Sequence, residues 1–188
     1  MKHIASLALL VVLCAFASQV QAGDAFKIDP VHSSVIFRIG HANVGIIYGR
    51  FNDAAGEFTI DKDDATKNTF NIELQVNNVD THQEKRDAHL KSPDFFNARQ
   101  YPKITFKSTN VAKGEGKMLE VTGDLTIHGV TKSIKVPVEI VGQGDFGGTF
   151  RVGIEAIFNI KRSDFEMKGL PGAVGDDVRL MIAIEGGK

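Results

Sequence analysis

The sequence predicts an all-β fold of about eight antiparallel strands with one helical insert. Apolar and polar residues alternate along most of the chain, which is typical of strands with one buried face. Short glycine-containing turns separate successive stretches, and this favours antiparallel hairpins. Such strands form either a sandwich or a closed barrel. The later strands span roughly 9 to 12 residues rather than the usual five or six, and this length favours a tall barrel.

The first 22 residues have the order of a secretory signal peptide. Met1-Lys2-His3 is a short basic start, residues 4–16 are apolar except for Ser6, and Val20-Gln21-Ala22 matches a small-residue cleavage pattern. The apolar run of about 13 residues is shorter than the roughly 20 that a membrane-spanning helix needs. We therefore expect an exported protein with a single mature domain over 23–188 and no stable membrane insertion.

Composition excludes several functional classes. Cys14 is the single cysteine and lies in the predicted leader, so the mature chain has no cysteine nucleophile, no Cys-ligated zinc and no redox-active thiol. The formal net charge of -1 provides no broad basic face, so we expect no nucleic-acid partner.

Eight stretches of alternating apolar residues predict the strands in chain order. They centre on residues 35–39, 58–60, 70–76, 104–106, 119–127, 134–140, 150–160 and 178–184. Gly114-Glu115-Gly116 and His128-Gly129 predict hairpin turns, and the glycine-rich stretch 142–148 predicts a longer, flexible connection. Pro137 predicts an edge or a bulge in its strand, because proline cannot donate to a sheet.

Residues 80–102 interrupt the alternation with a polar, charged segment. Asp80 or Thr81 can cap a helix, and Glu84 follows Thr81 at the spacing of a capping box. We predict a helix that runs to about Lys91 and stops before Pro93. Long connections outside the strands are enriched in function, so we expect this insert to cover one mouth of a barrel.

Few residues are candidates for catalysis or metal binding. His82 and His89 are about two helical turns apart, roughly 10 Å at Cα, so one metal could not easily take both, and we expect no metal site. The chain has no G-x-S-x-G, no S-x-x-K and no phosphate-binding glycine loop. We expect no catalytic residue and no enzyme. The catalytic alternative is a hydrolase or isomerase that uses His82, His89 and Asp87.

The phenylalanines suggest a binding role. Thirteen are present, one of them in the leader, and many have the buried parity of a strand. They either fill a core or line a cavity, and an eight-stranded barrel is about wide enough to hold one small ligand. The predicted apolar lining consists of Phe37, Phe51, Phe58, Phe95, Phe96, Phe106, Phe150 and Phe158.

Polar residues near the insert could meet the head group of such a ligand. We predict this role for His32, Arg86, His89 and Tyr101. The alternative is a polar network that includes Arg86 and Asp87 and fastens the insert to the barrel.

Several segments resemble the YceI-like, polyisoprenoid-binding family. They are Ile28–His41, Tyr48–Phe51, Gly56–Phe58, Val79–Thr81, Arg86–Leu90, Pro93–Phe96, Tyr101–Ser108 and Gly123–Lys132. The resemblance covers the whole mature chain. It implies a lipocalin-like antiparallel barrel with a helical insert near one mouth, located in the periplasm and often a homodimer. It also implies an elongated apolar cavity that takes an isoprenoid chain, such as a quinone or polyprenyl lipid, or a fatty amide.

We therefore expect a periplasmic binding or carrier protein for an isoprenoid or similar long-chain lipid of the quinone or polyprenyl type. Apart from such a bound lipid, we expect no cofactor. The non-catalytic alternative is a stress-related structural protein whose barrel is filled and holds no ligand.

Overall fold

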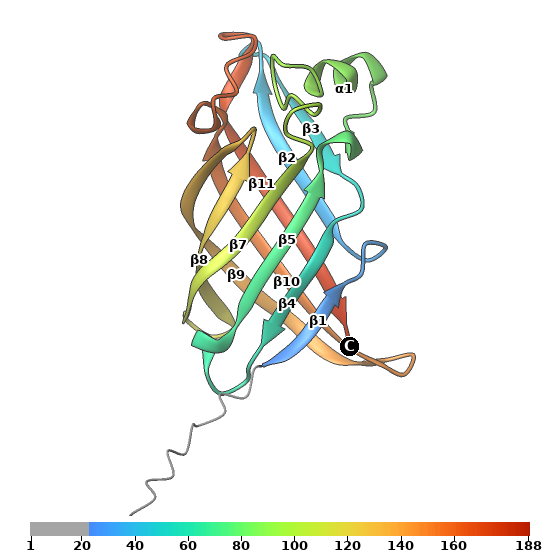
Figure 1. The fold of residues 1–188 in the computed structure, drawn as a ribbon, viewed down its shortest axis with the longest axis vertical. Coiled ribbons are helices and arrows are strands. Elements are labelled where there is room, and N and C mark those ends of the chain that lie inside the picture. The colour runs from blue at the N-terminus through green and yellow to red at the C-terminus, as the bar shows by residue number, and fades with distance from the viewer. Residues whose placement is uncertain (1–22) are drawn as a thin grey trace, which may run out of the picture.

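The computed structural model describes residues 23–188, so the predicted signal peptide lies outside the described residues. In this part of the chain, eleven strands form one antiparallel sheet that closes on itself (Figure 1). The strands are β1 (Asp24–Ile28), β2 (Ser34–His41), β3 (Gly45–Phe51), β4 (Ala55–Ile60), β5 (Thr69–Gln75), β6 (Val79–Asp80), β7 (Lys103–Lys113), β8 (Met118–Ile127), β9 (Val130–Phe146), β10 (Thr149–Lys161) and β11 (Val174–Gly187). The helices are α1 (Glu84–Leu90) and the 3-10 turns η1 (Ala65–Lys67), η2 (Val76–Asn78) and η3 (Arg162–Phe165).

Strand β1 closes the barrel. It pairs with β4 on one side and with the C-terminal end of β11 on the other. The closed ring is therefore β1-β4-β5-β7-β8-β9-β10-β11, which confirms the predicted eight-stranded antiparallel barrel. The remainder of β11 pairs with β2, and β2 pairs with β3, so these two strands build the wall above the point of closure.

The insert lies at the upper mouth, beside β2 and β3 (Figure 1). Strand β6 pairs with β3, and α1 follows it. The helix begins later than predicted, because the side chain of Gln83, not Asp80 or Thr81, caps it by accepting from the backbone N–H of Arg86. Thr81 instead donates its backbone N–H and its hydroxyl to Asp87. The predicted cap was wrong because this side-chain network holds Thr81 outside the helix.

The turns explain why the strands are long. His128 and Gly129 form the predicted hairpin turn, both with positive φ (53° and 76°). The predicted flexible connection over 142–148 was wrong: β9 continues through it, and the turn is only Gly147-Gly148, with φ of 61° and 82°. Gly142 and Gly144 remain extended and pair with β10. A two-residue turn of positive φ matches the twist of an antiparallel hairpin.

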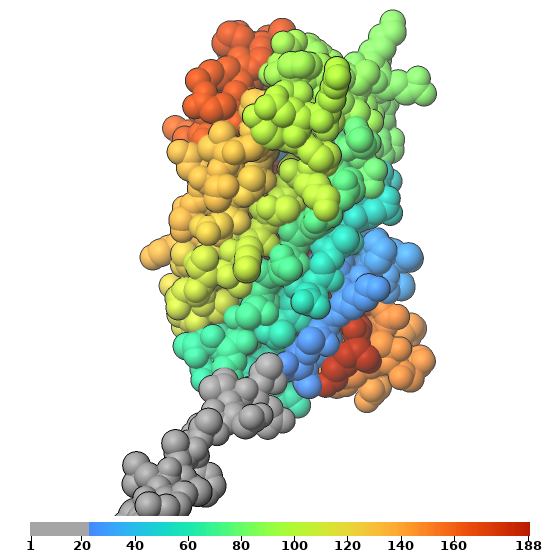
Figure 2. All heavy atoms as spheres, in the orientation of Figure 1, coloured from blue at the N-terminus to red at the C-terminus, as the bar shows by residue number. Residues whose placement is uncertain are grey.

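Four phenylalanine rings fill the barrel toward the end opposite α1; we call Phe26, Phe58, Phe70 and Phe150 the aromatic plug. Phe58 is fully buried and stacks on Phe26 and Phe70, with ring centroids 5.5 Å and 6.1 Å apart. Phe150 lies 6.2 Å from Phe26. Gly186 makes room for the plug, since a Cβ there would lie 2.6 Å from Cε1 of Phe58. On the face shown in Figure 2, the insert lies directly above the strand wall.

Candidate functional site: an apolar cavity in the barrel

An elongated cavity of about 290 Å³ runs through the barrel between the aromatic plug and the insert. On β10 the alternate residues Ile154, Ala156, Phe158 and Ile160 all line it. Six residues of strand extend roughly 20 Å, which is about 15 Å along the axis of a barrel with strands tilted about 40°. The same alternation on β11 contributes Val178, Leu180, Ile182 and Ile184. The wall is therefore a column of apolar side chains, suited in shape to an extended chain.

Six of the eight predicted phenylalanines line this cavity: Phe37, Phe51, Phe95, Phe96, Phe106 and Phe158. The structure places Phe58 and Phe150 below it, in the aromatic plug. Alternation directs their side chains inward, as predicted. Their position along the barrel axis, toward the end opposite α1, places them against other rings and not against the cavity.

The insert closes the upper mouth with its two adjacent phenylalanines. The ring of Phe96 packs edge-on against Phe51, with centroids 5.5 Å apart, while Phe95 is buried against the ring of His89 at 5.0 Å. Gly169, in the loop between β10 and β11, approaches so closely that a Cβ would lie 2.4 Å from the carbonyl oxygen of Asp94. The insert thus packs closely against the opposite loop at the mouth.

The polar part of the lining is small. Among the predicted head-group residues, Arg86 and His89 line the cavity, together with Thr81. Arg86 donates from Nε to Oγ1 of Thr81 at 2.7 Å and from Nη2 to its carbonyl oxygen at 2.7 Å. Nε2 of His89 lies 2.9 Å from Oδ2 of Asp94. The fastening network considered from the sequence therefore exists through Thr81, and the same residues face the cavity.

Arg162 is a lining residue that the sequence analysis missed. It is 7% exposed and donates four hydrogen bonds of 2.7–3.0 Å, to the carbonyl oxygens of Met167, Gly169, Val174 and Gly175. Burial lowers the pKa of its guanidinium, and the charge of Asp176 partly opposes that shift. The signal was present in the sequence, because Arg162 continues the inward alternation of β10 two residues after Ile160.

Met167 and Leu170 also line the upper end of the cavity and were not predicted. Both belong to the glycine-containing segment 167–173, which has no periodic pattern that could indicate the direction of its side chains.

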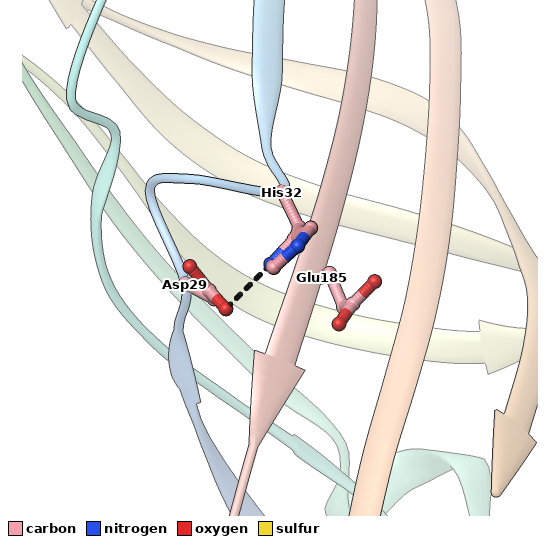
Figure 3. Close-up of side chains that lie close together, drawn as sticks. All are labelled: Asp29, His32 and Glu185. Carbon is pink, nitrogen blue, oxygen red and sulfur yellow. Dashed lines mark hydrogen bonds and ion pairs between the residues drawn. The ribbon is translucent and has the colours of Figure 1, made fainter. Parts of the chain in front are cut away.

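Two predicted head-group residues lie outside the lining. His32 is exposed on the turn between β1 and β2, at the end of β2 away from the mouth, and its Nδ1 is 2.8 Å from Oδ2 of Asp29 (Figure 3). Tyr101 packs edge-on against His128, with ring centroids 5.0 Å apart. It supports the turn between β8 and β9 instead of facing the cavity.

The comparisons with known proteins agree with this architecture. The YceI-like domain matches residues 26–186. The chain belongs to the YceI-like family. Protein YceI of Escherichia coli O157:H7 is 42% identical over 165 residues, 86% of this chain and 85% of that protein, which confirms the resemblance found in the sequence.

Solved structures show the same fold as this YceI-like chain. The YceI protein of Campylobacter jejuni has a TM-score of 0.71 and 31% identity, and the match covers 80% of this chain and 90% of that one. A polyisoprenoid-binding domain from Saccharophagus degradans, implicated in plant cell wall breakdown, has a TM-score of 0.67 and 16% identity, with 86% and 97% coverage.

Among residues 23–188 of this YceI-like chain, one cluster has residue types that could hold a metal ion. Asp29, His32 and Glu185 place ligand atoms within 4.8 Å of one another (Figure 3). However, Nη1 of Arg151 contacts the carboxylates of both Asp29 and Glu185. The hydrogen bonds from His32 and Arg151 hold the pKa of Asp29 well below its usual range. The arginine thus supplies the positive charge here, and the cluster joins the β1–β2 turn to β10 and β11.

The three residues of the catalytic alternative are not brought together. The side chain of His82 is 85% exposed, with Asp80 as its nearest carboxylate at 4.0 Å. Asp87 accepts from Thr81, and His89 pairs with Asp94. Within residues 23–188, no helix is long and apolar enough to span a membrane.

Proposed function

We propose that this YceI-like chain is an exported, periplasmic binding or carrier protein for an isoprenoid or similar long-chain lipid. The observation that carries the proposal is the unfilled, elongated cavity, lined almost entirely by apolar side chains. A structural protein without a ligand, the alternative considered from the sequence, would gain stability by filling this space, because cavities destabilise a core.

The chemistry of the wall favours a hydrocarbon chain. Burying each methylene contributes about 0.8 kcal/mol, so a chain of ten would gain on the order of 8 kcal/mol before the costs of ordering. The structural neighbour from Saccharophagus degradans is described as polyisoprenoid-binding, which supports an isoprenoid among such chains. Since each methylene discriminates only weakly, the wall selects mainly by length and girth.

The test is organic extraction of the purified full-length protein, followed by mass spectrometry. We expect close to one long-chain lipid per chain. Ala156→Phe should lower this content, because Ala156 lines the cavity midway along β10. Ile157→Phe is the matched control, since Ile157 is the next residue and points outward, 41% exposed. A folded wild-type protein that releases no lipid would refute the proposal.

Export is tested separately, by fractionating cells and measuring the intact mass of the protein. We expect a periplasmic protein that begins at Gly23, because the predicted cleavage follows Ala22. A cytosolic protein that retains Met1–Ala22 would contradict this part of the proposal. The homodimer that the resemblance implies stays a prediction.

A further inference from the structure

The polar end of the cavity carries positive charge without an acid. Among the described lining residues, the ionisable side chains are Arg86, Arg162, His41 and His89, and none is an aspartate or glutamate. The two arginines contribute a formal charge of +2 to the lining. Arg86 belongs to α1 of the insert, and Arg162 begins η3 after β10. Both elements lie toward the upper mouth (Figure 1).

Two other arginines are paired with carboxylates. Arg151 contacts Asp29 and Glu185, and Arg50 lies 3.4 Å from Asp80. In the described part of the chain, no carboxylate oxygen lies within the 4.0 Å ion-pair distance of Arg86 or Arg162.

The partners of these two guanidiniums are neutral. Arg162 donates to four backbone carbonyls, and Arg86 donates to the hydroxyl and carbonyl of Thr81. These bonds satisfy donors but do not neutralise charge. A buried cation such as Arg162 is costly unless an anion compensates it; the lining contributes none, and Asp176 offsets the cost of burial only in part.

From this we infer that the ligand itself supplies the anion: the lipid carries a phosphate or carboxylate head, held at the upper mouth beside Arg86 and Arg162, with its chain in the apolar column. The inference rests on the proposed function and adds the chemistry of the head group. Guanidinium groups bind phosphate and carboxylate by strong, charge-assisted hydrogen bonds. A neutral head such as an alcohol or quinone would add no negative charge beside the two guanidiniums.

The experiment compares two lipids that differ only in the head group. Farnesyl phosphate and farnesol are titrated into lipid-stripped protein at low ionic strength, and displacement of the neutral dye Nile red is measured. We expect farnesyl phosphate to bind at least about tenfold more tightly than farnesol. Inorganic phosphate, as a third arm, should leave the dye in place.

Three variants locate the effect. Arg86→Gln should reduce the preference for phosphate severalfold, and Arg86→Lys, which keeps the charge, should retain most of it. Arg179→Gln is the control, because it removes the same charge from an exposed position on β11. Circular dichroism and Nile red binding verify that each variant is folded.

The outcomes separate the two proposals. Equal affinity for both lipids, or an equal loss of preference in the Arg86→Gln and Arg179→Gln variants, overturns the anionic head and leaves lipid binding intact. Displacement of the dye by inorganic phosphate alone also overturns the inference, because the anion site would then be independent of the chain. If neither lipid displaces the dye, the proposed function fails as well.

Discussion

Phe58 and Phe158 both point into the barrel, yet the structure predicts very different costs for their removal. Phe58 is fully buried and lies between the rings of Phe26 and Phe70. Phe158 is half-buried and faces the cavity. Truncating each to alanine therefore tests whether the barrel contains a packed plug and an open column.

The magnitudes follow from burial. Phe58→Ala loses about 1.5–3 kcal/mol of transfer free energy. It also leaves a void on the order of 80 Å³, which at about 24 cal/mol per Å³ adds about 2 kcal/mol. The total is about 3.5–5 kcal/mol. Phe158→Ala loses part of the transfer free energy and opens no new void, so we expect about 1–2 kcal/mol.

Urea unfolding of the lipid-stripped protein at pH 7 measures both values. The midpoint should fall at least twice as far for Phe58→Ala as for Phe158→Ala, with the denaturant slope unchanged. Equal losses, or a larger loss for Phe158→Ala, would refute the division of the interior into plug and cavity.

Three further predictions use other features of the barrel. Gly186→Ala should cost about 1–3 kcal/mol in urea unfolding, because its Cβ would overlap the aromatic plug; an unchanged midpoint would contradict this. Gly49→Ala should destabilise by a similar amount and lower the extracted lipid, because its Cβ would lie 2.2 Å from Cζ of Phe37, a ring that lines the cavity. Wild-type lipid content and stability would show that Phe37 adjusts freely. Asp29→Asn should destabilise the protein at pH 7, since the pKa of Asp29 is lowered by His32 and Arg151. A lowered pKa contributes stability above the ordinary value of 3.8 that is lost as the pH falls below it. The difference in unfolding free energy between wild type and Asp29→Asn should therefore narrow below about pH 4. A difference that stays constant down to pH 2.5 would argue against the pairing of Asp29 with His32 and Arg151.

The alternation of apolar and polar residues predicted the strands well where one face is buried and the other is exposed to solvent. It failed at β3, where Ile46 and Tyr48 are exposed on the outside and Gly49 faces inward beneath Phe37. Apolar residues outside and a glycine inside remove the contrast on which a period of two depends. Strand β1 was missed because it has only five residues, of which Phe26 and Ile28 are buried.

The sequence predicted which side chains point into the barrel, but not how far along the barrel axis each one lies. The alternation along each strand points the side chains of Phe58, Phe150 and Phe158 inward. Only the register of the neighbouring strands decides which of these side chains packs against another ring. Arg162 could have been found by extending the alternation of β10 past its last apolar residue. The exclusion of His32 and Tyr101 from the lining depends on tertiary contacts, with Asp29 and His128 respectively, that no local pattern contains.

The closure of the ring through β1 has a consequence for how a guest would enter and leave. The hydrogen bonds of β1 to β4 and β11 lie at the end away from α1, and the segment 81–102 contributes no strand to the ring. Displacing that segment breaks none of the ring's ladder bonds. The mouth can therefore open in a local fluctuation that costs less free energy than global unfolding. The rate at which a ligand enters and leaves the cavity would then depend on the lifetime of the insert's contacts, while the strands of the barrel stay paired.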